Sequence, residues 1–187
     1  VGGYAKPCSF WHSDVDVSGG AIFDWGSHFI DQILAIMPGE VASVTGINQK
    51  RMWNHVTNAD HADVAITFTD GSRGLFTNSD LAAARKPKFY VLGTTGAIVG
   101  NWDPAAGATP ADLSAILTVH RADGSVEIVP NLVVTPHLFH QSVVEYLNNQ
   151  VSMNITTHQS RDVVAIMQAA EESALANGHP VKPILLR

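Results

Sequence analysis

Two hairpin patterns constrain the fold of this 187-residue chain most strongly. The segment 62–69 alternates in the way that a strand with one buried face does, and its apolar positions on that face are Ala62, Val64, Ile66 and Phe68. Asp70-Gly71 then provides the turn of a hairpin that returns through 72–79. A second turn, Ala122-Asp123-Gly124, separates the β-rich segments 113–120 and 125–130. Because such turns join antiparallel neighbours, whereas parallel strands need a long crossover, the sequence predicts a mostly antiparallel sheet.

Helical patterns flank these strands on both sides. Ser18 is the predicted N-cap of a helix from Gly19 to about Met37, which Pro38-Gly39 stops. Toward the C-terminus, Thr135-Pro136 starts a predicted helix to about Gln150, and Ser160 caps another that ends at Asn177-Gly178. Further strands are expected over 40–51, 88–93 and 98–99. The order predicts an α+β fold, with an open, mostly antiparallel sheet and helices packed on one face.

The composition excludes several classes of partner. With 11 basic and 17 acidic residues the net charge is −6, and without a basic run the sequence disfavours nucleic acid and anionic membrane surfaces. The single cysteine, Cys8, cannot form an internal disulfide or a thiolate zinc site. No apolar run approaches the roughly 20 residues that a membrane span needs. We therefore expect a cytoplasmic protein with a small-molecule partner.

The segment 18–31, SGGAIFDWGSHFID, places titratable residues within an otherwise apolar helix. At helical spacing one side is apolar, through Ile22, Phe29, Ile33 and Ile36, and the opposite side carries Asp24, His28, Asp31 and Ala35. A carboxylate one turn from an imidazole can orient the ring and stabilise its charged form. General acid–base catalysis uses residue pairs of this kind. Spacing alone favours a solvated helix face with a local ion pair. A metal site is a further but disfavoured interpretation, because no other cluster of His or carboxylate residues at ligand spacing completes the shell that His28 with Asp24 or Asp31 would begin.

The same residues resemble a known signature. GGAIFDWGSHFID is similar to the pattern G-G-x-x-x-D-x-G-x-H-x-x-D of the Gfo/Idh/MocA oxidoreductase family. The resemblance covers nearly the whole chain, with 101–112 as its weakest part, and the other segments that carry it are KPCSFWHSD, DVAITFTDGSRG, VLGTTGAIVG and SRDVVAIMQAAEESALANGHPV.

The resemblance implies a two-domain dehydrogenase, in which a Rossmann domain binds NAD or NADP and a following α/β domain binds a sugar, polyol or cyclitol. Residues 1–187 resemble the second, substrate-binding and oligomerisation domain. The N-terminal Rossmann domain is expected to be absent from this chain, since no G-x-G-x-x-G follows a strand and no Glu-Lys-Pro motif occurs. We expect the chain to be inactive alone and not to bind NAD(H), and we assign it no cofactor-binding or metal-binding residue.

The resemblance also assigns roles in hydride transfer. His28 is expected to accept the hydroxyl proton as hydride leaves the substrate, and Asp24 to orient the substrate or the imidazole. Trp11, His12 and Asp14 are candidate substrate-binding residues. Many relatives carry Trp-Arg where this chain carries Trp11-His12, so a familiar basic contact is absent or replaced here.

Assembly and an alternative function complete the expectations. The family resemblance implies pairing through the open face of the sheet, and moderately apolar second faces on the strands support a homodimer or homotetramer. The alternative is a non-catalytic carbohydrate- or protein-binding module that retains the fold. A Rossmann segment encoded immediately upstream favours the enzyme, whereas a free-standing domain favours the module.

Overall fold

The computed structural model describes residues 10–102, 115–132, 137–153 and 155–186. The chain divides into two compact units. Unit 1 consists of Val1–Ala84 and Ser152–Arg187, and unit 2 consists of Arg85–Val151.

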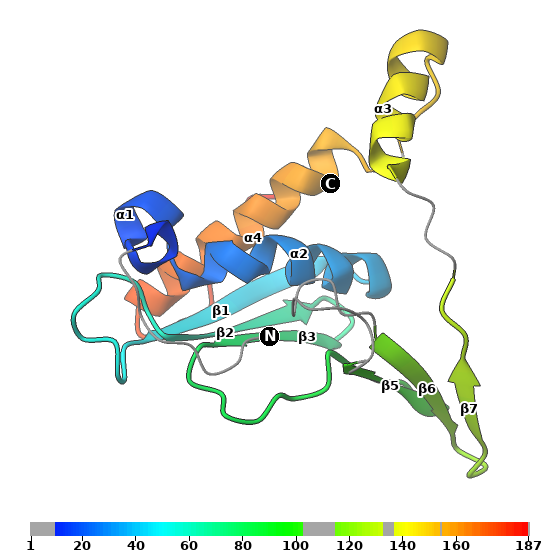
Figure 1. Cartoon of the computed structure of the whole chain (residues 1–187), viewed down its shortest axis with the longest axis horizontal. Helices are drawn as coiled ribbons and strands as arrows, with labels where there is room; N and C mark the ends of the chain where they lie inside the picture. The colour runs from blue at the N-terminus through cyan, green and yellow to red at the C-terminus, as the bar shows by residue number, and fades with distance from the viewer. Residues whose placement is uncertain (1–9, 103–114, 133–136, 154, 187) are drawn as a thin grey trace. The chain divides into compact units, whose positions relative to one another are not determined.

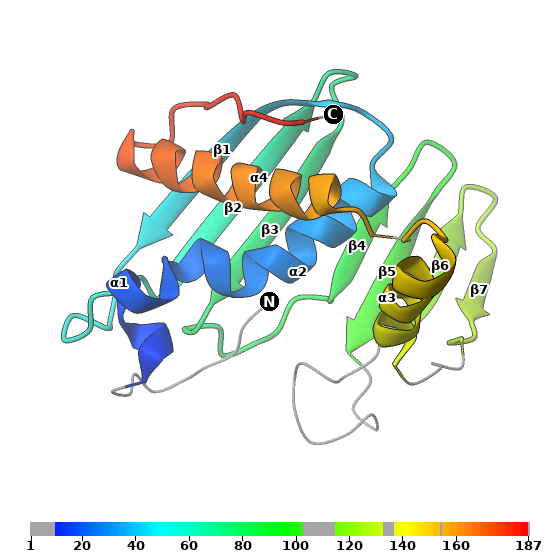
Figure 2. The same ribbon diagram turned by 90° about the horizontal axis from the view of Figure 1, so that it is seen from above.

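Unit 1 is a three-stranded antiparallel sheet with two long helices on one face. Its strands β1 (Val41–Gln49), β2 (His61–Phe68) and β3 (Arg73–Ser79) lie in the order β1-β2-β3. Helices α2 (Ala21–Ile36) and α4 (Thr157–Leu175) lie side by side across one face of this sheet (Figures 1 and 2). The predicted α+β class, antiparallel pairing and one-sided helical layer are therefore observed in this unit.

The core of unit 1 lies between the sheet and the two helices. All four apolar positions predicted for the inner face of β2 are buried, namely Ala62, Val64, Ile66 and Phe68. Helix α2 buries a stripe that differs from the predicted one and consists of Ala21, Ile22, Gly26, Ile30 and Leu34. Ile36, predicted to face the core, is 50% exposed. The stripe is rotated because α2 packs on α4 as well as on the sheet, with Gly26 against Met167.

Two glycines let the helices approach the sheet closely. A Cβ atom at Gly46 would lie 2.0 Å from the carbonyl oxygen of Ala170 in α4, and one at Gly74 would lie 2.4 Å from Ile33 in α2. The amide of Gly46 also donates to Ser173 Oγ at 2.9 Å, so α4 satisfies a backbone group at the outer edge of β1.

The helices begin at residues other than those predicted. A short helix α1 (Val15–Ser18) ends at Ser18, and Gly19 and Gly20, both with positive φ, connect it to α2. Ser18 is therefore not the N-cap of α2. Helix α4 begins at a capping box formed by Thr156 and Gln159 rather than at Ser160. The predicted start at Thr135-Pro136 lies outside the described residues.

Unit 2 contains a four-stranded antiparallel sheet and one helix. The strands lie in the order β4-β5-β6-β7, and helix α3 (Leu138–Asn149) follows them. Their bounds are β4 (Phe89–Leu92), β5 (Gly96–Trp102), β6 (Ala115–Arg121) and β7 (Val126–Val129). The strand register places exposed apolar side chains on one face of this sheet, namely Tyr90, Leu92, Ile116, Val126 and Ile128. We call these five residues the exposed sheet face.

Among the described residues, no helix combines the length and the apolar character that crossing a membrane would require.

Candidate functional site

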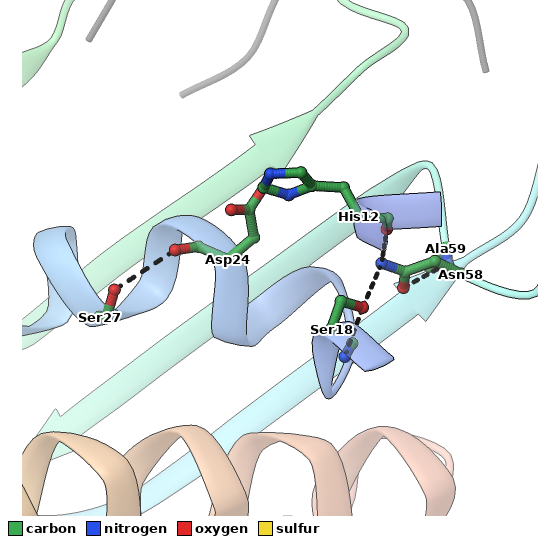
Figure 3. Close-up of polar contacts among 7 residues, drawn as sticks. His12, Ser18, Asp24, Ser27, Asn58 and Ala59 are labelled. Atoms are coloured by element: carbon green, nitrogen blue, oxygen red, sulfur yellow. Dashed lines mark hydrogen bonds and ion pairs between the residues drawn. The ribbon is translucent and has the colours of Figure 1, made fainter. Parts of the chain in front are cut away.

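His12 and Asp24 meet on the exposed side of α2. His12 lies in the short 3-10 helix η1 (Trp11–Ser13), and Asp24 lies in the first turn of α2. The ring Nδ1 of His12 is 3.1 Å from Asp24 Oδ2, and the two side chains are 36% and 26% exposed. Figure 3 shows the ring lying against the carboxylate. The structure thus pairs two residues that the sequence assigned separately, one to substrate binding and one to catalysis.

Asn58 fixes the position of η1. This buried side chain donates from Nδ2 to the backbone oxygen of His12 at 2.7 Å and to Ser18 Oγ at 3.2 Å (Figure 3). The backbone amide of Asn58 also donates to the oxygen of Ser13 at 3.1 Å. Because these bonds join η1, the end of α1 and the segment before β2, they set where the His12 ring projects.

Aromatic neighbours orient the His12 ring further. Its centroid lies 3.5 Å from that of Trp11 and 5.0 Å from that of Phe10. Both aromatic side chains are about half exposed. Trp11 therefore lies beside the His12–Asp24 pair, and its assignment to substrate binding remains a prediction.

Asp14 has a different setting. Its carboxylate caps α1 by accepting from the backbone amide of Asp16, and it also accepts from Thr57 Oγ1 at 3.1 Å. Capping of this kind satisfies free amides at a helix start. The structure thus gives Asp14 a local structural role, and its assignment to substrate binding remains a prediction.

His28 lies one helical turn beyond Asp24 and is exposed. Its ring centroid is 5.9 Å from that of Trp25. Within the described part of the chain, Asp24 forms an ion pair with His12 and none with His28. The predicted placement of Asp24 and His28 outside the core is confirmed, whereas the carboxylate is paired with another imidazole.

Asp60 is a buried carboxylate near this site that the sequence analysis missed. It accepts from the backbone amides of Arg51, Met52 and Trp53 at 2.7–3.0 Å. Burial raises the pKa of Asp60, but these amides together lower it below the ordinary value. Asp60 therefore holds the loop after β1 as a structural anion.

Asp80, immediately after β3, is the second missed carboxylate. Its amide donates to the backbone oxygen of Asp60 at 3.0 Å. Burial, with the negative charges of Asp24 and Asp60, raises the pKa of Asp80 to about 6, and His12 acts in the opposite direction. The charges of Asp24, Asp60 and His12 therefore all act on the carboxyl group of Asp80.

The hairpin pattern in the sequence could have predicted that Asp60 and Asp80 lie close together. Register pairs His61, at the start of β2, with Ser79, at the end of β3. Polar residues just outside these two positions must therefore lie at the same end of the sheet. Asn58, Asp60 and Asp80 all occupy such positions.

The start of α2 does not fit a dinucleotide. A helix N-terminus after glycines can bind a pyrophosphate, but a Cβ atom at Gly20 would lie 2.6 Å from a carboxylate oxygen of Glu171. Burial raises the pKa of Glu171, while a bond from Asn48 and the amide of Ile22 lower it. All strand pairs among the described residues are antiparallel, so these residues provide no βαβ unit.

The described residues also contain no group of three or more His, Cys, Asp or Glu side chains arranged to hold a metal ion.

Known proteins share both sequence and fold with this chain. It is 21% identical over 180 residues to scyllo-inositol 2-dehydrogenase (NADP(+)) IolW of Bacillus subtilis (strain 168), covering 88% of this chain and 49% of that protein. The chain thus spans about half the length of this curated relative.

Solved structures show the same fold. An NAD-binding protein from Listeria innocua superimposes with a TM-score of 0.72 at 22% identity, covering 97% of this chain and 52% of the other. Levoglucosan dehydrogenase in complex with NADH and L-sorbose superimposes with a TM-score of 0.74 at 20% identity, covering 97% and 56%.

A family profile decides the classification. The profile of the GFO/IDH/MocA C-terminal domain matches residues 3–99, which include the Asp24 and His28 signature, helix α2 and the hairpin of β2 and β3. This match covers more than half of the chain. The chain belongs to the GFO/IDH/MocA C-terminal domain family.

Proposed function

We propose that residues 1–187 form the substrate-binding domain of an NAD(P)-dependent oxidoreductase that acts on a hydroxyl or carbonyl group of a sugar, polyol or cyclitol. The observation that carries the proposal is the polar, partly exposed face of α2, where Asp24 and His28 lie within the family signature and where His12 of η1 contacts Asp24. The names of the relatives, a scyllo-inositol dehydrogenase and a levoglucosan dehydrogenase, support this substrate class.

The nicotinamide cofactor is assigned to a separate Rossmann domain. Two observations support this division. The carboxylate of Glu171, from α4, lies beside Gly20 at the start of α2, and the described strands pair antiparallel. When bound by that domain, the nicotinamide ring accepts or donates the hydride. The choice between NAD and NADP then depends on residues of the nucleotide-binding domain.

In this proposal His28 is the acid–base group of the reaction. An exposed imidazole can take a proton from a hydroxyl group and return it in the reverse direction. Asp24 lies one turn away and hydrogen-bonds substrate hydroxyls or supports the charge that develops. Trp11 and His12 contact the sugar or polyol, since an aromatic face and a polar ring suit the two kinds of surface that such molecules carry.

The proposal also includes self-association and a cytoplasmic location. A homodimer or homotetramer would cover the exposed sheet face of unit 2, whose apolar side chains are costly to leave in water. The single cysteine suits a reducing compartment, because the chain needs no disulfide.

The test uses the complete protein in which this chain is joined to its nucleotide-binding domain. We expect the coding sequence immediately upstream to encode a Rossmann segment, and the purified protein to reduce NAD⁺ or NADP⁺ when scyllo-inositol or levoglucosan is added as a probe. A free-standing coding sequence, together with polyol binding but no nicotinamide reduction, would contradict the enzyme and favour the binding module.

A further inference from the structure

We propose that Glu171 is a positioning residue for the reaction, because its carboxylate caps the start of α2 from α4 and so sets where Asp24 and His28 lie. The inference rests on the proposed function, in which these two residues of α2 act on the substrate. Glu171 itself contacts no substrate in this proposal, since it acts through the helix that carries them.

The start of α2 has no cap of its own. Its N-cap residue is Gly20, which makes no side-chain hydrogen bond to the helix. Gly19 and Gly20 both have positive φ, and glycine has more conformational freedom than any other residue, so the connection from α1 does not by itself hold the helix in place. The first amides of a helix also need acceptors from outside that helix. At the start of α2 these acceptors must come from water or from elsewhere in the fold.

The carboxylate of Glu171 lies where such an acceptor is needed. A Cβ atom at Gly20 would be 2.6 Å from its Oε1 atom, and Oε1 is buried with no side-chain donor among the described residues. The other oxygen, Oε2, accepts from Asn48 Nδ2 at 2.5 Å. Burial raises the pKa of Glu171, whereas the bond from Asn48 and the amide of Ile22, in the first turn of α2, lower it. The carboxylate therefore interacts with the backbone of the helix that it faces.

The position of Glu171 suits a negative charge on a rigid support. The N-terminus of a helix carries a partial positive charge, which a carboxylate within the first turn stabilises. The backbone under Glu171 is also tied to the sheet, since the amide of Gly46 in β1 donates to Ser173 Oγ in α4 at 2.9 Å. Glu171 thus connects the start of α2 to the same frame of β1 and α4.

The cap is close to the residues proposed to act on the substrate. Asp24 lies in the first turn of α2, and His28 lies one turn later. Because a helix moves as a stiff rod, a shift of its first turn displaces both side chains. A misplacement of about 1 Å can lower a rate by about 10²-fold. Loss of the Glu171 cap is therefore expected to slow turnover from a distance.

The first test measures amide hydrogen exchange at Ile22 in the complete protein. We expect Glu171→Ala to speed this exchange by about 5- to 30-fold, the change that loss of a helix cap brings. Glu171→Gln keeps an acceptor oxygen and should keep most of the protection. Glu172→Ala is the matched control, because Glu172 is exposed and accepts from Gln168 within α4. Equal exchange at Ile22 in the wild type and Glu171→Ala would overturn the cap.

The second test measures turnover in the complete protein, with scyllo-inositol and NADP⁺ as the probe pair. We expect Glu171→Ala to lower kcat by about tenfold or more, as a displaced reacting group does, with the KM for NADP⁺ unchanged. Glu171→Gln should restore most of the activity. If Glu171→Ala does not fold, Glu171→Asp takes its place, because its shorter side chain withdraws the carboxylate from α2.

A core variant separates positioning from a loss of stability. Val163 is buried in α4, about two turns before Glu171. Val163→Ala should lower the melting temperature and leave kcat at the wild-type value. Unchanged kcat in Glu171→Ala, or an equal loss of kcat in Val163→Ala, would overturn the positioning role.

The two tests also separate this inference from the proposed function. If the wild-type protein reduces nicotinamide with no sugar or polyol, the proposed function is wrong and the positioning role fails with it, while hydrogen exchange still decides whether Glu171 caps α2. If the wild type is active and Glu171→Ala is equally active, the proposed function stands and the positioning role is wrong.

Discussion

Asp80 shows how the fold changes the chemistry of a single residue. It is partly buried beside Asp24 and Asp60, and its pKa is raised to about 6 from an ordinary value of 3.8. The folded protein therefore binds the Asp80 proton more tightly than the unfolded chain does. It follows that Asp80 contributes stability at low pH, and that this contribution is lost as the pH rises from about 4 through about 6.

We expect Asp80→Asn to increase the free energy of unfolding above pH ~6 by about 1 kcal/mol, an estimate reduced for the partial exposure of the site. Below pH ~4 the variant and the wild type should be equally stable, because Asp80 is then protonated in both states. Urea unfolding at a series of pH values measures both quantities.

Asp70→Asn is the control for that experiment. Bonds from the hydroxyl and amide of Ser72 lower the pKa of Asp70, so its carboxylate stabilises the folded state at neutral pH. The Asp70 variant should therefore gain no stability above pH ~6. An Asp80→Asn effect that does not change with pH would contradict the environment described for Asp80.

Sequence spacing predicted where Asp24 and His28 lie on α2, but it did not predict which residue Asp24 contacts. The i, i+4 relation correctly kept Asp24 and His28 out of the core, because helical periodicity alone determines the face. The partner of Asp24 could not be predicted in this way, since His12 reaches it through η1, which Asn58 holds from 46 residues away in the sequence. A contact that depends on a distant hydrogen bond leaves no local pattern.

At the scale of elements, strands were easier to predict than helix faces. Alternation with a period of two identified the inner face of β2 without error, because a single sheet face was buried there. The buried stripe of α2 was misplaced by part of a turn, since α2 packs on α4 through Gly26 as well as on β3. The start of α4 was also misplaced, because both Ser160 and Thr156 are good caps and only Thr156 has Gln159 three residues later.

The exposed sheet face of unit 2 carries a prediction about assembly. We expect the chain to form homodimers or homotetramers at micromolar concentration, and Leu92→Glu, on that face, to shift it toward the monomer, because a buried unpaired charge opposes association. Light scattering measures the mass in solution.

Leu175→Glu is the control for assembly, since Leu175 is similarly exposed but lies at the end of α4, in the helical layer of unit 1. It should leave the mass unchanged. A wild-type chain that is monomeric at 20 kDa would show that the exposed sheet face does not mediate self-association.

At the scale of the whole molecule, the proposed reaction is divided between two domains. The chain spans about half of its curated relative. Its helix α2 carries Asp24 and His28, the residues proposed to act on the substrate, and all strand pairs among the described residues are antiparallel. The family resemblance could be recognised from sequence because the signature is compact and local. Substrate identity could not be predicted, because the proposed substrate-binding residues Trp11 and His12 are oriented by tertiary contacts.

The most direct measurement of the central claim is kcat of His28→Ala in the complete protein, with the sugar or polyol that the wild type oxidises. We expect kcat to fall by about 10²–10⁴-fold, the usual cost of removing a general base, while nucleotide affinity stays nearly unchanged. His179→Ala, which removes an exposed imidazole after α4, should keep wild-type turnover. If the His28→Ala variant turns over as fast as the wild type, His28 on α2 is not the group that exchanges the proton in this reaction.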